Sequence, residues 1–215
     1  MKMESSVYNI DNMEFMRSLP DKCFDLCIAD PPYRDENVPM PEMRKLRSHK
    51  EMFSSGKPTE EFFKEIERIS KEQIIFGANN FARPFMGFIA WDKCVRGSDR
   101  YSQVEIASIS EGLGSTSVLC QITTYVEDKI HPTQKPSELY AWIFRKYLPN
   151  GGRVFDPYLG SGSSRIAAYK LGIDFVGCEI DKTYFDRMNE RFEYECHGKH
   201  TLKDGRVITE LTIFD

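Results

Sequence analysis

The sequence predicts an α/β protein built on a doubly wound, parallel β-sheet. Short apolar runs alternate with amphipathic helical segments along the chain, which is the pattern of a parallel sheet with helices on both faces. Such sheets bind ligands at the carboxyl ends of their strands. Acidic residues stand at four of these predicted ends, namely Asp11, Asp30, Asp156 and Glu179. We therefore expect a ligand site lined by acids.

The first two strands are predicted at 7–10 and 24–29, with a short amphipathic helix around 13–19 between them. Thr59 is a good N-cap residue, and apolar side chains follow it at helical spacing through Ile69. Further strands of this half are expected at 73–76, 88–91, 104–109 and 118–125.

The C-terminal third is predicted to alternate helix and strand around a glycine-rich turn. Strands are expected at 153–155 and 175–178, and helices at 138–148, 163–171 and from 179–181 to about Tyr194. Gly172 is expected to close the second of these helices at its C′ position. The tail turns at Asp204-Gly205 between alternating apolar residues, which predicts a small hairpin.

Length and composition predict one domain over residues 1–215, without a membrane span or a signal peptide, and a cytoplasmic location. Within it we expect a basic loop at 34–58, a short insert at 110–130 and a hairpin extension at 195–215. None of the six cysteines forms a CxxC pair, so we expect reduced, buried thiols and no metal.

The net charge of -4 argues against a nucleic-acid partner, because phosphate contacts need a basic surface. Local basic clusters oppose that argument and supply candidate DNA contacts. The same clusters are equally consistent with ordinary solvated charge. The candidates are Arg34, Arg44, Lys45 and Arg47 in the loop, and Lys93 and Arg96 in a second cluster.

The segment Asp156-Pro-Tyr-Leu-Gly-Ser-Gly162 predicts a nucleoside cofactor. Gly160 and Gly162 permit a tight turn before a helix whose N-terminus offers unpaired N–H groups. Glu179 ends the next strand, where a carboxylate accepts hydrogen bonds from ribose hydroxyls. The segment is neither the dinucleotide fingerprint nor a P-loop. Because Asp156 would repel a pyrophosphate and suits a cofactor with an amino group and a cation, we predict S-adenosylmethionine.

The segment Asp30-Pro31-Pro32-Tyr33 has the groups that are needed to activate an exocyclic base amine. Such an amine is a poor nucleophile because its lone pair is delocalised into the ring. The Asp30 carboxylate and the Pro31 carbonyl can accept its two N–H groups and so localise the lone pair. Pro31 and Pro32 stiffen the loop, and Tyr33 offers a ring on which an extruded base can stack. A simple strand-ending turn is the alternative interpretation.

Three segments in this order resemble the beta-class DNA amino-methyltransferases, in which the catalytic motif precedes the cofactor motif. They are Asp30-Pro-Pro-Tyr33, His131-Pro-Thr-Gln-Lys-Pro136 and Asp156-Pro-Tyr-Leu-Gly-Ser-Gly162. The runs 76–81 and 89–93 look like the small phage and prophage members. The resemblance covers about residues 7–194 and implies a Rossmann-like, S-adenosylmethionine-dependent methyltransferase fold with circularly permuted motifs.

The resemblance also implies roles for single residues. Glu179 would take the ribose hydroxyls, and Asp11 would lie near the cofactor adenine. For His131, a cap or surface position is as consistent with the sequence as a cofactor contact. The methionine part would be held by Asp156, Gly160, Ser161 and Gly162 with Ser163 beside them, and its carboxylate would be covered by Thr133, Gln134 and Lys135.

In this family an Asp in the catalytic motif goes mostly with N6 of adenine, so the resemblance implies adenine in duplex DNA, flipped into the pocket. N4 of cytosine, RNA adenine, a non-catalytic subunit of a methylase complex and a glutamine-amide methyltransferase stay as alternatives; the last class typically has Asn in place of Asp30. Target recognition would fall to the insert, the basic loop or a second subunit. A homodimer is a further hypothesis, because so small a chain has little surface to grip a duplex.

Overall fold

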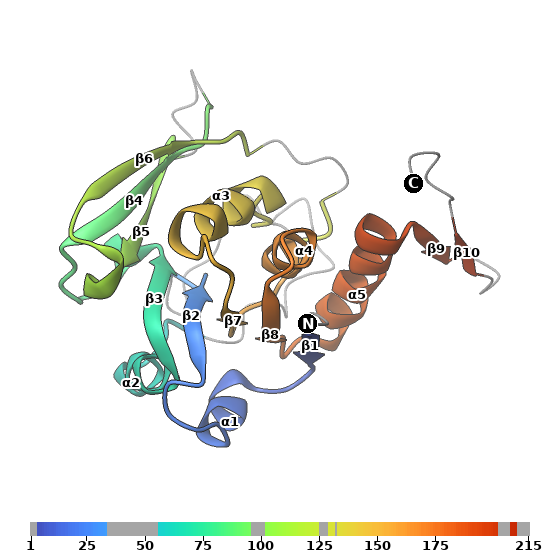
Figure 1. Cartoon of the computed structure of the whole chain (residues 1–215), viewed down its shortest axis with the longest axis horizontal. Helices are drawn as coiled ribbons and strands as arrows, with labels where there is room; N and C mark the ends of the chain where they lie inside the picture. The colour runs from blue at the N-terminus through green and yellow to red at the C-terminus, as the bar shows by residue number, and fades with distance from the viewer. Residues whose placement is uncertain are drawn as a thin grey trace.

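The computed structural model describes residues 4–33, 56–95, 102–124, 129–131, 133–201 and 207–209. Among these residues an eight-stranded sheet runs in the order β1-β8-β7-β2-β3-β5-β4-β6, with helices on both of its faces (Figure 1). Its strands are β1 (Ser5–Tyr8), β2 (Phe24–Ala29), β3 (Ser70–Phe76), β4 (Gly87–Asp92), β5 (Val104–Ile109), β6 (Ser117–Gln121), β7 (Arg153–Asp156) and β8 (Asp174–Cys178). The predicted α/β class is confirmed.

The sheet is mostly parallel, but β5 pairs antiparallel with both β3 and β4. This corrects the fully parallel sheet that the sequence predicts. Residues 93–103 join β4 to β5, and a parallel connection needs a crossover of about a dozen residues or more, usually with a helix. As a consequence, the amino end of β5 lies at the same edge as the carboxyl ends of its neighbours.

In the described part of the chain, helices α1 (Asn12–Arg17) and α2 (Glu60–Ile69) cover one face of the sheet, and α3 (Ser137–Tyr147), α4 (Ser163–Lys170) and α5 (Lys182–His197) cover the other (Figure 1). Successive residues of β2 point to opposite faces: Cys27 packs in the core that contains Ile66 of α2, whereas Leu26 packs in the core that contains Ile143 of α3. Burial on both faces explains why these strands read as continuous apolar runs.

Several predicted boundaries are confirmed by their caps. The Thr59 side chain accepts a hydrogen bond from Phe62 N at 3.3 Å and starts α2, and Gly172 follows α4 with a positive φ of 69°. Strand β1 ends two residues earlier than predicted, because Asp11 caps α1 by accepting from Glu14 N at 3.0 Å. Strand β6 ends at Gln121 rather than at Tyr125.

Two of the predicted accessory segments are partly described. Strand β6 lies in the predicted insert 110–130 and pairs parallel with β4 at the end of the sheet. Within the predicted C-terminal hairpin, β9 (Lys199–Thr201) pairs antiparallel with β10 (Val207–Thr209) after α5 (Figure 1). The predicted turn at Asp204-Gly205 and most of the basic loop lie outside the described residues.

All six cysteines are unpaired, as predicted; Cys27, Cys120 and Cys178 are buried, whereas Cys23 and Cys196 are half-buried and Cys94 is exposed. Within the described ranges, the helices are all too short or too polar to cross a membrane.

Candidate active site

The four acids singled out in the sequence lie along one edge of the sheet. Strands β1, β8, β7 and β2 are consecutive neighbours, and they lead into Asp11, Glu179, Asp156 and Asp30, respectively. Strands β2 and β7 pair directly, and paired strands are about 4.8 Å apart. Asp30, just after β2, and Asp156, the last residue of β7, therefore lie at neighbouring strand ends. The sheet thus brings together two segments that are far apart in the sequence.

Asp30 lies in a group of charged and phenolic side chains. Its Oδ2 accepts from Lys135 Nζ at 2.6 Å, and its Oδ1 accepts from the Tyr33 hydroxyl at 2.5 Å. Lys135 is predicted to cover the methionine carboxylate of a cofactor; in the structure its ammonium lies between two half-buried carboxylates. Only 5% of the Lys135 side chain is exposed, which explains why it needs such partners.

Glu105 of β5 is the second of these carboxylates, and the sequence did not single it out. Its Oε1 lies 2.7 Å from the Tyr33 hydroxyl and 2.9 Å from Lys135 Nζ, and its Oε2 lies 2.9 Å from Lys93 Nζ. A fully parallel sheet would have placed Glu105 at the opposite edge. We call Asp30, Tyr33, Lys93, Glu105 and Lys135 the catalytic cluster.

Burial and charge act against each other within the catalytic cluster. Burial raises the pKa of Asp30, Glu105 adds to that rise, and Lys135 opposes it. Burial also favours the neutral form of Glu105, but Lys135 and Lys93 outweigh it and hold the pKa of Glu105 at about 2. For Lys135, burial would lower the pKa, yet Asp30 and Glu105 raise it. The cluster therefore holds two carboxylates and two ammonium groups in balance.

The Tyr33 ring packs on the backbone of Gly77, just after β3. A Cβ at Gly77 would lie 2.2 Å from Tyr33 Cε1, so no larger residue fits beneath the ring. Gly77 also has a positive φ of 67°, which glycine adopts without strain. The Tyr33 ring also meets Phe81 edge to face, with centroids 6.2 Å apart.

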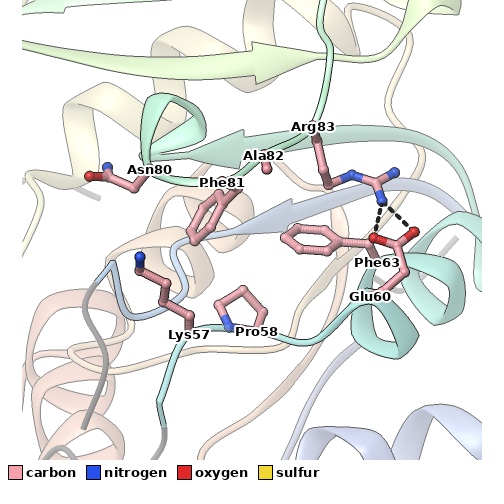
Figure 2. A pocket seen from close by; sticks show the side chains of 8 residues that line it. All are labelled: Lys57, Pro58, Glu60, Phe63, Asn80, Phe81, Ala82 and Arg83. Atoms are coloured by element: carbon pink, nitrogen blue, oxygen red, sulfur yellow. Dashed lines mark hydrogen bonds and ion pairs between the residues drawn. The ribbon is translucent and has the colours of Figure 1, made fainter. Parts of the chain in front are cut away.

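Phe81 also lines a surface cavity of about 310 Å³, shown in Figure 2. Phe63 stands opposite it, and the Arg83 guanidinium lies 4.6 Å from the centre of the Phe63 ring. Arg83 Nη1 donates to Glu60 at 3.0 and 3.1 Å (Figure 2), and Arg83 also pairs with Glu67. Two aromatic rings and several charged or polar side chains thus line the cavity, and its arginine is paired with carboxylates.

The predicted cofactor turn, 156–163, begins at Asp156, which is 3% exposed. Its Oδ1 accepts from Tyr158 N at 2.9 Å and its Oδ2 accepts from Ser164 Oγ at 2.5 Å. Burial raises the pKa of Asp156 to about 7, against the hydrogen bonds from Ser164 and Tyr158, and the Asp30 charge adds to the rise. Among the described residues no lysine or arginine forms an ion pair with it.

Glu179 closes the cofactor turn from β8. Its Oε2 accepts from Gly160 N at 2.8 Å and its Oε1 accepts from Asp181 N at 2.9 Å. Burial raises the pKa of Glu179 despite these backbone donors. At Gly162, φ is 73°, and a Cβ would lie 2.3 Å from Met188 Cγ, so α4 and α5 need a glycine at this point.

The serines of the turn have other partners. Ser163 and Ser161 were predicted to hold a cofactor; Ser163 Oγ lies 3.2 Å from Ser161 Oγ and accepts from Arg191 Nη1 at 2.9 Å. Arg191 also donates to the Ser161 carbonyl at 3.0 Å. Ser164, which the sequence did not single out, is the serine that contacts Asp156.

The segment from His131 to Lys135 runs between the two motifs. The His131 ring lies 3.7 Å from the position of a Cβ at Gly160, whereas Lys135 contacts Asp30. Between them, Gln134 is 5% exposed and its Oε1 accepts from Ile130 N at 3.0 Å. Its Nε2 is buried without a hydrogen-bond partner among the described residues. Thr133 is exposed and contacts the His131 ring at 3.1 Å.

Of the six candidate DNA contacts, only Lys93 is described, and its ammonium pairs with Glu105. Arg34, Arg44, Lys45, Arg47 and Arg96 lie outside the described residues.

Comparisons with known proteins agree with this geometry. Residues 89–190 match the N6/N4 family described as DNA methylase. Type II methyltransferase M2.DpnII of Streptococcus pneumoniae is 37% identical over 65 residues, 30% of this chain and 24% of that protein. Type II methyltransferase M.HpaI of Haemophilus parainfluenzae is 36% identical over 76 residues, 35% of this chain and 24% of that protein. The match thus spans about a quarter of the length of these relatives.

Solved structures extend the likeness to nearly the whole chain. The complex of M1.HpyAVI with S-adenosylmethionine has a TM-score of 0.59 and 20% identity, over 86% of this chain and 98% of that one. The cytosine-N4-specific PvuII DNA methyltransferase has a TM-score of 0.59 and 13% identity, over 91% of this chain and 93% of that one.

The fold is that of the S-adenosylmethionine-dependent DNA methyltransferases. On this fold, the chain is similar to the N6/N4 DNA methylase family over residues 89–190 and to type II DNA methyltransferases over shorter stretches.

Proposed function

We propose that this protein transfers a methyl group from S-adenosylmethionine to the exocyclic N6 amine of adenine in duplex DNA. The observation that carries the proposal is the adjacency of β2 and β7, since Asp30 follows one strand and Asp156 ends the other. An acceptor for a neutral amine and an acid for a cationic cofactor thus occupy neighbouring strand ends.

The residues of the cofactor turn fit S-adenosylmethionine by their chemistry. Asp156 and Glu179 are carboxylates without a cationic partner in the described part of the chain, and the cofactor brings an ammonium and a sulfonium. Each carboxylate has lone pairs beyond those used by its present donors, so Glu179 can also accept from ribose hydroxyls. The unpartnered Gln134 Nε2 is a donor suited to the cofactor carboxylate. When bound, the cofactor supplies an electrophilic methyl group.

The catalytic cluster would act on the base. Asp30 accepts one N–H of the amine and the Pro31 carbonyl accepts the other, which restores the lone pair of the nitrogen as a nucleophile. The Tyr33 ring, which packs against Gly77 and Phe81, would border a flipped base. Such positioning supplies a large share of the rate enhancement when the reacting groups are held in line.

The test uses purified protein, labelled S-adenosylmethionine and unmethylated duplex DNA, followed by digestion and separation of the nucleosides. We expect the label in N6-methyladenine. Label in N4-methylcytosine would keep the family and overturn the base, and label only in RNA or protein would overturn the proposed substrate. Cofactor binding without transfer to any of these substrates would favour a non-catalytic subunit.

The oligomeric state needs a separate measurement. We expect a homodimer on DNA, because one small chain offers little surface to hold a duplex. Sedimentation of a monomer both with and without DNA would contradict this.

A further inference from the structure

The hydroxyl of Tyr33 lies between two carboxylates but carries a single proton. It is 2.5 Å from Asp30 Oδ1 and 2.7 Å from Glu105 Oε1, and both distances are those of strong hydrogen bonds to an anion. The phenol can donate to only one of these oxygens at a time. Its proton can therefore pass from Asp30 to Glu105 by rotation about the C–O bond, while the heavy atoms stay in place.

Lys135 has the same choice of partners. Its Nζ lies 2.6 Å from Asp30 Oδ2 and 2.9 Å from Glu105 Oε1. Lys93 Nζ lies 2.9 Å from the other oxygen of Glu105, Oε2, so each oxygen of the Glu105 carboxylate has an ammonium partner. The exposed fractions of the Glu105 and Lys135 side chains are only 12% and 5%, and water therefore competes little for these groups.

An incoming amine competes with Tyr33 and Lys135 for Asp30, because these two donors already occupy one acceptor position on each of its oxygens. A buried phenol that loses its acceptor and finds no other is destabilised. Glu105 already stands at hydrogen-bond distance from that phenol.

We propose that Glu105 is a positioning residue that accepts the Tyr33 proton when Asp30 turns to the amine. The inference rests on the proposed function, since it takes the amine as the group that Asp30 receives. Glu105 itself touches no substrate; it acts through Tyr33, with Lys93 and Lys135 holding its carboxylate in place. No covalent bond changes in the exchange, and only the phenol hydrogen moves between two acceptors.

The test compares two variants that lose the same charge. E105Q keeps an acceptor oxygen for Tyr33, whereas E105L removes it. We expect kcat of E105L to be about tenfold to a hundredfold below that of E105Q, from the cost of an unpaired buried donor, with KM for DNA and cofactor affinity alike in both. In a Tyr33→Phe background the Gln and Leu variants should have equal kcat, because the proton that distinguishes them is gone.

Three results would overturn the inference: equal kcat in E105Q and E105L, a difference that persists without the Tyr33 hydroxyl, or a parallel loss of cofactor affinity. If E105L does not fold, E105D replaces it, since it keeps the charge and withdraws the carboxylate from Tyr33. Its kcat should then lie below that of E105Q, and the reverse order would overturn the inference. Glu72→Gln, in the first half of β3, is the matched control and should retain wild-type activity.

A spectroscopic measurement separates this inference from the proposed function. In protein with ¹³Cζ-labelled tyrosine, the Tyr33 signal is assigned by its loss in Tyr33→Phe. In Asp30→Leu it should stay that of a hydrogen-bonded phenol, donated to Glu105, and it should change only in the Asp30→Leu, Glu105→Leu double variant. An unchanged signal there would overturn the exchange even in a protein that methylates DNA. A wild-type protein without transferase activity would refute only the proposed function.

Discussion

The two halves of the site differ in the partners of their carboxylates. In the catalytic cluster, Asp30 and Glu105 share Lys135, and Glu105 also has Lys93. In the cofactor turn, Asp156 accepts from a serine and a backbone N–H. The first half is balanced before any ligand arrives, whereas the second holds negative charge that no described cation matches.

The difference corresponds to the charges of the two proposed ligands. A neutral amine needs an acceptor that is ionised; in the catalytic cluster, burial raises the pKa of Asp30 and Lys135 opposes that rise. A cationic cofactor instead supplies its own positive charge to the cofactor turn. The contrast therefore predicts that substitutions in one half change turnover and that substitutions in the other change cofactor affinity.

The largest effect is expected from Asp30→Ala. It removes the acceptor of the amine, and we expect methyl transfer to fall by at least about a hundredfold, as when one charge-stabilising group is removed from an enzyme site. Cofactor affinity, measured by calorimetry, should be retained because Asp30 follows β2 and not the cofactor turn. Asp30→Asn keeps one acceptor oxygen and should be impaired less. Loss of cofactor binding in Asp30→Ala would contradict the prediction that the catalytic cluster affects turnover and the cofactor turn affects cofactor affinity.

A smaller effect on turnover is expected from Gly77→Ala. The added Cβ would lie 2.2 Å from the Tyr33 ring, so the ring must move and its hydroxyl must leave the two carboxylates. We expect kcat to fall by about tenfold or more, which corresponds to one lost buried hydrogen bond, with cofactor affinity retained.

Gly172→Ala is the matched control for this substitution. Gly172 has a φ of 69°, close to that of Gly77, but a Cβ there would have nothing within 4 Å. It should cost about 1 to 2 kcal/mol of stability from the left-handed backbone alone and leave kcat unchanged. Equal kcat in the two alanine variants would show that the packing of the Tyr33 ring on Gly77 does not affect turnover.

The parts of the fold that local pattern decides were predictable from the sequence. Apolar runs located every strand of the sheet, and the caps at Thr59 and Gly172 located helix ends, because these signals depend on neighbours in the chain. The direction of β5 was not predictable in this way, since it depends on which strands pair. Glu105 was missed for that reason alone.

The same distinction applies to single residues of the site. Lys135 was found by its motif, but its partners Asp30 and Glu105 come from distant segments, and the motif does not encode their positions. Ser163 and Ser164 are adjacent in the sequence, and only the rotation of α4 decides that Ser164 reaches Asp156. The cofactor roles assigned to the 131–135 segment and to the glycine-rich turn stay predictions.

The smallest effect, and the one that sharpens the contrast most directly, is the pH dependence of cofactor binding. Burial raises the pKa of Asp156 to about 7, so below that pH the free protein holds a proton there that a cationic cofactor must displace. Affinity should therefore weaken as pH falls, by about tenfold between pH 8 and pH 6, since one pH unit below the pKa corresponds to a factor of about ten.

Stability of the ligand-free protein should change in the opposite sense. Because the folded pKa of Asp156 lies above that of the unfolded chain, its contribution is largest below the unfolded value and is lost as pH rises toward about 7. Asp156→Asn should remove both slopes and leave only what the amino group of the cofactor contributes. Calorimetric titration measures the cofactor affinity and thermal unfolding measures the stability, both at the same series of pH values. An unchanged affinity slope in Asp156→Asn would assign the proton to another group, and Glu179, whose pKa burial also raises, is the next acid to replace.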